Sequence, residues 1–557
     1  MKRDPKSLAA STFDLAVVGG GIYGAAIARE AALCGLSVAL VERQDFASAT
    51  SSNSHKVIHG GLRYLQHLDL PRVRESLHER CVLERIAPHL VHPLPVVVPT
   101  FGHGLRGKEL LSLGVVLHRL FATATGARAG IIKGLEPGPI GRRRLLELLP
   151  GLERSDATGG VVFYDSQVYS SERLVIGYLH AAADSGAMLA NYVEAVGFLR
   201  EGGRVGGVLA RDTAEGSTFE LRARAVVNAA GPWIAQLLAS AGMGWREGPA
   251  VRGLNVVTRQ LFPTVAAGLY GRASHDDAAA MLRRGQRLYF LVPWRDRTII
   301  GTAYSPFAED PSTLSVGPAD VEKLLAEVNF AYPAARLTLA DVSLVYAGLL
   351  PSSGVSPRTG EIQVAKQYRI QDHSADGSPG LFSVEGVKYT TARDVAARFV
   401  ERLFRSWSKT PPPPRSTERV LPGGSVGRLA DYVRSEIRRW PALPAAALER
   451  LVRTYGSAYG EVLRYLDSPD APEEAALLRT ETLHAVRDEM ALTLGDVVFR
   501  RTEIGSAGHP GRATLETVAG VLATELRWDP QRIEREIADV ESRYGVRGML
   551  SASRRTC

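Results

Sequence analysis

The hydrophobic pattern at the start of the chain predicts one strand–helix–strand unit. Residues 13–18 form an apolar run of strand length, which a glycine cluster at 19–21 ends. Apolar residues then recur at helical spacing through 22–34, Gly35 follows as the expected helix cap, and 36–41 form a second apolar run. A unit of about 30 residues built in this way is typical of a parallel sheet.

Two later apolar runs predict further strands of the same sheet. Residues 225–230 end at Gly231, and residues 381–384 end at Glu385 with a predicted helix at 390–404 behind them. Because these runs are far apart in the chain, we expect a discontinuous domain. The runs within 245–305 instead predict antiparallel strands of a second, substrate-facing sheet.

The last part of the chain has a different pattern. A proline run at 410–414 cannot continue a helix and predicts a stiff spacer, whereas 427–545 shows repeated helical periodicity. We therefore expect an all-α C-terminal domain. The predicted boundaries are 11–100, 155–240 and 340–408 for the nucleotide-binding domain, 101–154 and 241–339 for a substrate or cap domain, 409–416 for the linker and 417–557 for the helical domain.

Composition narrows the function classes. The 557 residues are 45% hydrophobic and 23% charged, as in an ordinary globular protein, and the net charge of +8 suits an anionic substrate, cofactor or surface. No dense basic stripe interleaved with aromatics occurs, which disfavours a nucleic-acid-binding or RNA-modifying protein. Three scattered cysteines predict neither a disulfide framework nor a metal site. Without an apolar stretch of about 18–20 residues, we expect a cytoplasmic or, at most, peripheral membrane protein.

The glycine cluster carries a dinucleotide signature. In Gly19-x-Gly21-x-x-Gly24, the first glycine permits the turn, the second lets the backbone approach a pyrophosphate, and the third lets the helix pack closely. The anionic pyrophosphate then meets the amino end of the helix. Glu42, at the end of the second strand, accepts hydrogen bonds from a ribose and would repel a 2′-phosphate. The absence of a second such fingerprint favours FAD over NAD, and Ser48–Ser54 adds hydroxyl and amide groups for an extended cofactor.

Several motifs then resemble one family. HGGLRY at 59–64, VVNAAGPWI at 226–234, VEGVKYTTAR at 384–393 and DEMALTLGDVVFRRT at 488–502 resemble the FAD-dependent glycerol-3-phosphate dehydrogenases, in the same order and over nearly the whole chain. The resemblance implies an α/β protein with a glutathione-reductase-like FAD-binding Rossmann domain, an antiparallel-sheet substrate domain and an all-α C-terminal domain. It implies oxidation of sn-glycerol 3-phosphate to dihydroxyacetone phosphate, by hydride transfer to flavin N5.

The resemblance also implies the site residues. His59 is the expected general base, because imidazole titrates near working pH, although it is alternatively a donor that only orients a loop. Arg63 and Lys388 are expected to stabilise an anionic substrate and the charge on reduced flavin, or else to be structural cations. Tyr64, Asn255 and Lys366 complete the expected substrate contacts, with packing alone as the alternative for Tyr64. The expected FAD contacts are Gly19, Gly21, Ile22, Tyr23, Gly24, Glu42, Thr50, Ser51, Ser52, Gly231 and Lys388.

The departures from the family lie on the substrate side. Leu350 stands where the family has a substrate-gripping arginine, Asn255 replaces a pocket histidine, and Lys366 replaces a downstream arginine. Arg252 and Arg259 are further candidates to compensate. The alternative is an enzyme of the same fold that oxidises a different alcohol or an amine, because neither leucine nor lysine copies the planar fork of arginine.

Membrane contact and the electron acceptor follow only from the resemblance. It implies peripheral membrane association, with quinone as the electron acceptor. A minority of members use oxygen instead, so an oxidase is an alternative. A homodimer is also possible. Residues 105–149 mix leucine-rich turns with arginine and lysine, as an interfacial helix does. The alternative is an ordinary amphipathic helix of the cap domain.

Overall fold

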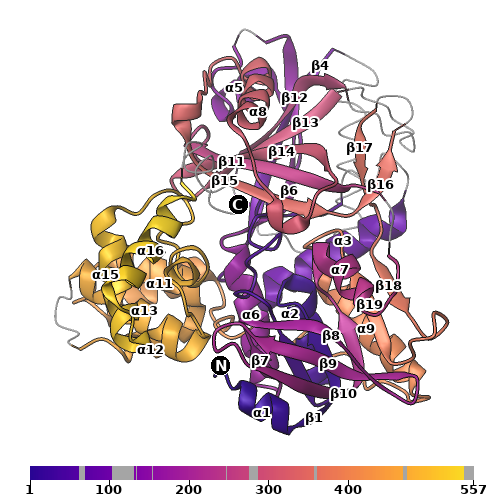
Figure 1. The fold of residues 1–557 in the computed structure, drawn as a ribbon. Helices are drawn as coiled ribbons and strands as arrows, with labels where there is room; N and C mark the ends of the chain where they lie inside the picture. The colour runs from indigo at the N-terminus through magenta and orange to yellow at the C-terminus, as the bar shows by residue number, and fades with distance from the viewer. Residues whose placement is uncertain are drawn as a thin grey trace.

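The computed structural model describes residues 1–61, 69–102, 131–132, 134–153, 155–245, 248–274, 286–356, 360–467 and 473–544. Figure 1 shows two sheets, one above the other, with the C-terminal helices packed at their side. None of the helices in the described part of the chain is both long and apolar enough to cross a bilayer.

The lower sheet is the predicted nucleotide-binding sheet. Its strands follow the order β18-β19-β10-β1-β2-β7, and β1 pairs in parallel with both β2 and β10. Ala190, Val41, Val18 and Asn228 stand side by side, and each is the last residue of its strand, so four strands end at one edge; Ser383 of β19 pairs with Asn228. The prediction that these distant runs share a parallel sheet is therefore confirmed. The strands are β1 (Thr12–Val18), β2 (Val38–Val41), β7 (Met188–Ala190), β10 (Thr218–Asn228), β18 (Arg369–Asp372) and β19 (Leu381–Glu385), with β8 (Val193–Glu201) and β9 (Arg204–Asp212) appended to β10 as an antiparallel extension.

Helices cover this sheet because its strands are apolar on both faces. The residues of β2 are buried throughout, as expected for a central parallel strand. The helix α2 packs against both α6 and α9. The helices of this part are α1 (Pro5–Ala10), α2 (Ile22–Leu33), α3 (Leu70–Ile86), α6 (Ser171–Ala183), α7 (Ile234–Ala239) and α9 (Ala392–Ser406).

The upper sheet contains the predicted antiparallel strands. Its order is β15-β11-β14-β13-β12-β4-β6-β3, with β5 paired to β6, and Phe290 of β13 faces Gly301 of β14. It consists of β3 (Val57–Ile58), β4 (Val91–Phe101), β5 (Gly138–Gly141), β6 (Ala157–Val168), β11 (Ala250–Arg259), β12 (Ala266–Ser274), β13 (Gln286–Trp294), β14 (Arg297–Phe307) and β15 (Val342–Leu350). The helices α5 (Arg142–Leu148) and α8 (Pro318–Ala331) and the hairpin of β16 (Ser352–Val355) with β17 (Ile362–Val364) accompany it.

Four strands of the upper sheet differ from the sequence prediction. β3, β4, β6 and β15 lie in ranges predicted for the nucleotide-binding domain, yet they pair in the second sheet. An apolar run predicts a buried strand, but it does not tell which of two sheets the strand joins.

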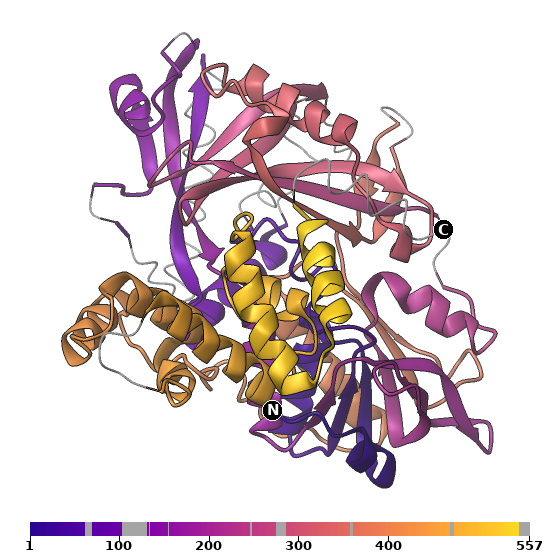
Figure 2. The same cartoon turned by 60° about the vertical axis from the view of Figure 1, so that its left-hand side comes forward.

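The C-terminal part is helical, as predicted. It contains α10 (Leu429–Arg439), α11 (Ala445–Tyr455), α12 (Tyr459–Leu463), α13 (Glu474–Glu489), α14 (Leu494–Asp496), α15 (Arg512–Leu526) and α16 (Pro530–Glu541). Its apolar core includes Trp294 and Leu344 of the upper sheet. Figure 2 shows the last of these helices, in yellow, in front of the two sheets, with orange helices of the same part to the left.

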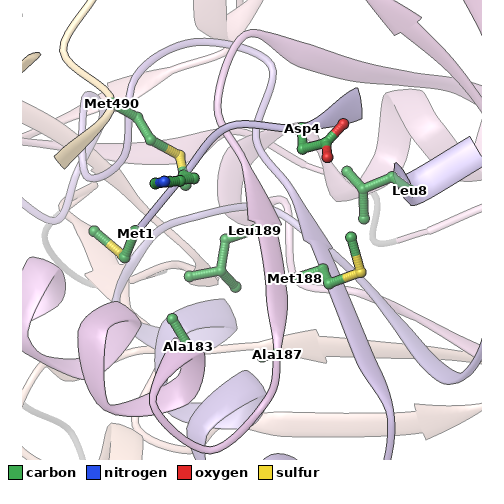
Figure 3. Close-up of a pocket in the computed structure, with 9 residues that line it drawn as sticks. Met1, Asp4, Leu8, Ala183, Ala187, Met188, Leu189 and Met490 are labelled. Atoms are coloured by element: carbon green, nitrogen blue, oxygen red, sulfur yellow. The ribbon is translucent and has the colours of Figure 1, made fainter. Parts of the chain in front are cut away.

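A small cavity lies at the edge strand β7. Methionine, leucine and alanine side chains form most of its lining, and Met1, Leu189 and Met490 point toward it (Figure 3). Its lining includes none of the residues of the glycine fingerprint or of the run Ser48–Ser54.

Candidate active site

The turn between β1 and α2 leaves no room for side chains. Gly19 has φ +109°, and a Cβ there would stand 2.6 Å from the carbonyl oxygen of Ala229. A Cβ on Gly24 would stand 1.8 Å from the carbonyl oxygen of Gly19, so the helix packs directly on the turn. Ser51 Oγ accepts a hydrogen bond of 3.0 Å from the backbone N–H of Ile22, which brings the predicted hydroxyl run to the amino end of the helix. These residues fit the pyrophosphate of a dinucleotide.

Glu42 lies at the carboxyl end of β2, beside this turn. Its carboxylate accepts hydrogen bonds from the backbone N–H groups of Gly20, at 2.6 Å, and Gln44, at 3.0 Å. Burial raises the pKa of Glu42, and the two N–H donors oppose that rise. The carboxylate is thus fixed at the strand end where a nucleotide ribose binds in this type of sheet.

Tyr23 fixes the loop that carries Lys388. Its hydroxyl donates to the carbonyl oxygen of Lys388 at 2.6 Å, and a Cβ on Gly386 would stand 1.8 Å from its ring. Burial lowers the pKa of the Lys388 ammonium to about 8, while the nearby Glu75 carboxylate opposes the fall. Lys388 is therefore a cation at neutral pH that titrates close to it.

His59 is paired with a carboxylate that sequence analysis missed. β3 pairs with β6 so that Ile58 faces Ser166, and this register brings His59, the residue after β3, to Asp165 of β6. The His59 Nδ1 lies 2.8 Å from one Asp165 oxygen, and the N–H of Gly60 donates to the other at 2.7 Å. Burial would raise the pKa of Asp165, but the hydrogen bonds and charge of His59 outweigh it and lower that pKa.

This pairing assigns the tautomer of His59. An ionised carboxylate only accepts hydrogen bonds, so in the neutral imidazole Nδ1 carries the proton and Nε2 presents its lone pair. The His59 side chain is 51% exposed, whereas that of Asp165 is 5% exposed. The ring therefore opens toward a reactant on one side and is held from behind on the other. Asp165 lies in an ordinary apolar strand, and only the strand register reveals it.

A buried ion pair anchors the segment that leads to His59. The Lys56 Nζ donates to Glu172 at 2.7 Å, to Ser171 Oγ at 3.1 Å and to the carbonyl oxygen of Ser52 at 3.3 Å. Farther back, the Thr50 hydroxyl donates to a β15 carbonyl oxygen at 3.0 Å. The hydroxyl run is thus tied to both α6 and the upper sheet. No sequence signal distinguishes Lys56 from a surface lysine.

The predicted substrate residues are placed unevenly. Asn255 is buried on β11 and accepts a 2.8 Å hydrogen bond from the Thr302 hydroxyl of β14. Lys366 follows β17, and the N–H of the preceding Ala365 donates to the carbonyl oxygen of Pro351 at 2.8 Å. The loop with Lys366 therefore lies beside Leu350.

The other expected substrate groups contribute differently. The guanidinium groups of Arg252 and Arg259 bind Asp320 and Asp341, at 2.7 and 3.2 Å, so each already has a carboxylate partner. Gly231, with φ +57°, begins the turn after β10. Arg63 and Tyr64, like most of 105–149, lie outside the described residues.

A dinucleotide cradle at the ends of a parallel sheet, next to a histidine held against a second sheet, is the layout of a two-domain dinucleotide-dependent oxidoreductase. The sequence profile of the family "FAD dependent oxidoreductase" matches residues 14–391, and that of the "C-terminal domain of alpha-glycerophosphate oxidase" matches residues 415–533. The chain therefore belongs to the FAD-dependent oxidoreductase family, and it is an enzyme that uses FAD.

Two named relatives and one solved structure are similar to nearly the whole of this chain. A glycerol-3-phosphate dehydrogenase of Mycobacterium leprae is 34% identical over 541 residues, which cover 95% of this chain and 88% of the relative. One from Synechocystis is 29% identical, with 95% of each chain covered. The glycerol-3-phosphate dehydrogenase of Bacillus halodurans, solved with FAD, superposes with a TM-score of 0.75 at 26% identity, covering 96% of this chain and 95% of that one. These similarities confirm the resemblance to the FAD-dependent glycerol-3-phosphate dehydrogenases that the sequence motifs indicated.

Proposed function

We propose that this enzyme oxidises sn-glycerol 3-phosphate to dihydroxyacetone phosphate, the reaction of the dehydrogenases after which its relatives are named. The single observation that carries the mechanism is the His59–Asp165 pair at the border of the two sheets. Oxidation of a secondary alcohol removes a proton from the hydroxyl and a hydride, which is a hydrogen nucleus with two electrons, from the carbon. A positioned base for the proton is therefore the group that the protein must provide.

In this proposal His59 takes the hydroxyl proton at Nε2. The imidazolium that forms keeps its Nδ1–H directed at the Asp165 carboxylate, which lies 2.8 Å from Nδ1. The carboxylate stabilises the new positive charge. Gly60 keeps the carboxylate oriented through its N–H. Bound FAD supplies the acceptor for the hydrogen and the two electrons that leave the carbon.

Different residues at the strand ends would hold different parts of the cofactor. Gly19, Gly21, Gly24, Ile22 and Ser51 would hold the pyrophosphate at the amino end of α2, and Glu42 would bind the ribose. Thr50, Ser52 and Gly231 would complete the cofactor contacts. Tyr23 positions Lys388, whose positive charge would favour the anionic form of the reduced cofactor.

The phosphate end of the substrate is the altered part of the pocket. The hydrogen bond from Ala365 to Pro351 brings the Lys366 loop next to Leu350, where the family arginine is missing. We infer that Lys366, with Arg63, supplies the positive charge for the phosphate, and that Tyr64 and Asn255 border the glycerol. Lysine acts as a point charge here, without the paired hydrogen bonds of arginine.

The direct test is anaerobic reduction of the purified, FAD-loaded enzyme. sn-Glycerol 3-phosphate should bleach the flavin absorbance and yield dihydroxyacetone phosphate, whereas glycerol and the opposite enantiomer should not. A His59→Gln variant should retain its flavin but bleach far more slowly. Bleaching by an unphosphorylated alcohol or an amino acid, with none by sn-glycerol 3-phosphate, would instead establish the alternative substrate class.

We further propose a peripheral membrane contact through the segment 105–149, with quinone as acceptor. Two described residues of this segment, Ile131 and Ile132, expose 48% and 45% of their surface, although both are large apolar side chains. Sedimentation with acidic liposomes tests this contact. Protein that stays in solution at low salt would favour oxygen or a soluble acceptor.

A further inference from the structure

The proposed chemistry leaves one motif of the sequence without a role. DEMALTLGDVVFRRT, at 488–502, lies in the C-terminal helical domain, yet its charged residues Glu489, Asp496, Arg500 and Arg501 are buried. Burying ionised groups is costly unless each finds a partner, so their partners indicate what the motif does. Several of those partners belong to the FAD-binding part of the chain.

Two consecutive arginines of the motif bind one aspartate of the FAD-binding part. A π-helical turn over Val497–Arg501 brings both guanidinium groups to Asp45. Arg501 donates two hydrogen bonds to the carboxylate, at 2.6 and 2.8 Å, and Arg500 adds one at 2.5 Å. Asn191 donates a fourth, at 3.0 Å. Both oxygens of Asp45 are thus used, chiefly by the C-terminal domain.

Asp45 belongs to the turn that supports the glycine fingerprint. Within this turn, Glu42 accepts the N–H of Gly20 at 2.6 Å, and the N–H of Ala47 donates to the carbonyl oxygen of Gly20 at 3.1 Å. Phe46 packs so closely that a Cβ on Gly20 would stand 2.6 Å from its ring. A shift of Asp45 would therefore move both the expected ribose ligand and the glycine turn.

A second contact reaches the same turn from the motif. The Tyr192 hydroxyl donates to the Asp496 carboxylate, at 2.9 and 3.0 Å to its two oxygens. The backbone N–H of Tyr192 donates to the carbonyl oxygen of Gln44 at 2.9 Å, and that of Val193 donates to the carbonyl oxygen of Glu42 at 2.8 Å. The motif thus holds the turn from two directions.

We propose that the 488–502 motif is a clamp that preorganises the ribose-side turn, so that the C-terminal domain sets the affinity of the enzyme for FAD. Arg500, Arg501 and Asp496 act as positioning residues through Asp45 and Tyr192. Holding a binding loop in its bound shape increases affinity because less order must be imposed on binding. This role is independent of the substrate, since it concerns only the cofactor.

The test compares the same substitution inside and outside the clamp. Arg501→Lys keeps the charge but cannot span both oxygens of Asp45. Arg487→Lys is the matched control, because Arg487 forms an equivalent two-bond pair with Glu525, at 2.8 and 2.7 Å, within the C-terminal domain. The apoproteins are titrated with FAD, without substrate, and the rise in melting temperature on FAD binding is measured. We expect about a tenfold higher FAD Kd for Arg501→Lys and no change for Arg487→Lys.

A milder pair keeps the proposal testable if Arg501→Lys does not fold. Tyr192→Phe removes the hydroxyl that binds Asp496, and Tyr459→Phe removes a buried hydroxyl that binds Glu436, a pair of the C-terminal domain outside the 488–502 motif. Tyr192→Phe alone should weaken FAD binding severalfold, while the KM for substrate of the FAD-saturated enzyme stays unchanged. Wild-type FAD affinity in the folded clamp variants, or an equal loss in the controls, would overturn the proposal.

Discussion

Replacing Asp165 with asparagine tests the proposed base through its partner. Asp165 accepts from Gly60 with one oxygen and from His59 Nδ1 with the other, at 2.7 and 2.8 Å. Asparagine has the same shape but only one acceptor oxygen, and the N–H of Gly60, which is fixed in the backbone, would donate to it. Its NH2 group then faces Nδ1 and can only donate, so the imidazole must move its proton to Nε2. The lone pair needed for the substrate hydroxyl is lost.

The magnitude follows from what a general base contributes. Asp165→Asn should lower kcat by about 10²- to 10⁴-fold, while the FAD Kd and the melting temperature stay close to those of the wild type. The assay is rapid-mixing measurement of anaerobic flavin bleaching over a range of pH. His59→Gln should cost a similar factor, and the double variant little more, because the two residues act as a unit. A folded Asp165→Asn enzyme with wild-type kcat and pH profile would refute the reasoning.

Three further predictions follow from single sites. Gly24→Ala should abolish FAD retention, because its Cβ would stand 1.8 Å from a backbone oxygen, whereas the Cβ of Gly520→Ala in α15 meets no atom and should stabilise the helix by about 1 kcal/mol. Flavin content and melting temperature are measured for both variants. A Gly24→Ala enzyme that retains its full flavin content would contradict the proposed pyrophosphate site. Lys388→Arg should raise the pH at which kcat/KM falls on the alkaline side. The Lys388 ammonium is lost as pH rises through its pKa of about 8, while a guanidinium stays charged. The same alkaline pH dependence in both enzymes would exclude Lys388 as the titrating group. Leu350→Arg should lower the KM for sn-glycerol 3-phosphate by about tenfold at unchanged FAD affinity, and an unchanged or higher KM would place the phosphate elsewhere.

Local patterns allowed much of the fold to be predicted from the sequence. The β1–α2–β2 unit depends on neighbouring residues, so its strand, glycine turn and helix were all predictable. The role of Gly24 was predictable for the same reason, because helix packing on a turn needs a residue without a side chain. The helical C-terminal part likewise followed from its periodicity.

What was not predictable depends on contacts between distant segments. Asp165 meets His59 through the register of β3 on β6, and Lys56 meets Glu172 across more than a hundred residues. A single sequence contains no signal for either pair. The assignment of β6 to the upper sheet also depends on strand pairing, which an apolar run alone does not specify.

We propose that His59 and bound FAD together oxidise the secondary alcohol of sn-glycerol 3-phosphate. This reaction can be tested by the anaerobic rate of flavin bleaching with substrate that carries deuterium at the alcohol carbon, compared with ordinary substrate. We predict slower bleaching with the deuterated compound, in wild type and His59→Gln alike, and dihydroxyacetone phosphate as product. Bleaching at the same rate with both compounds, or none with either, would contradict the account.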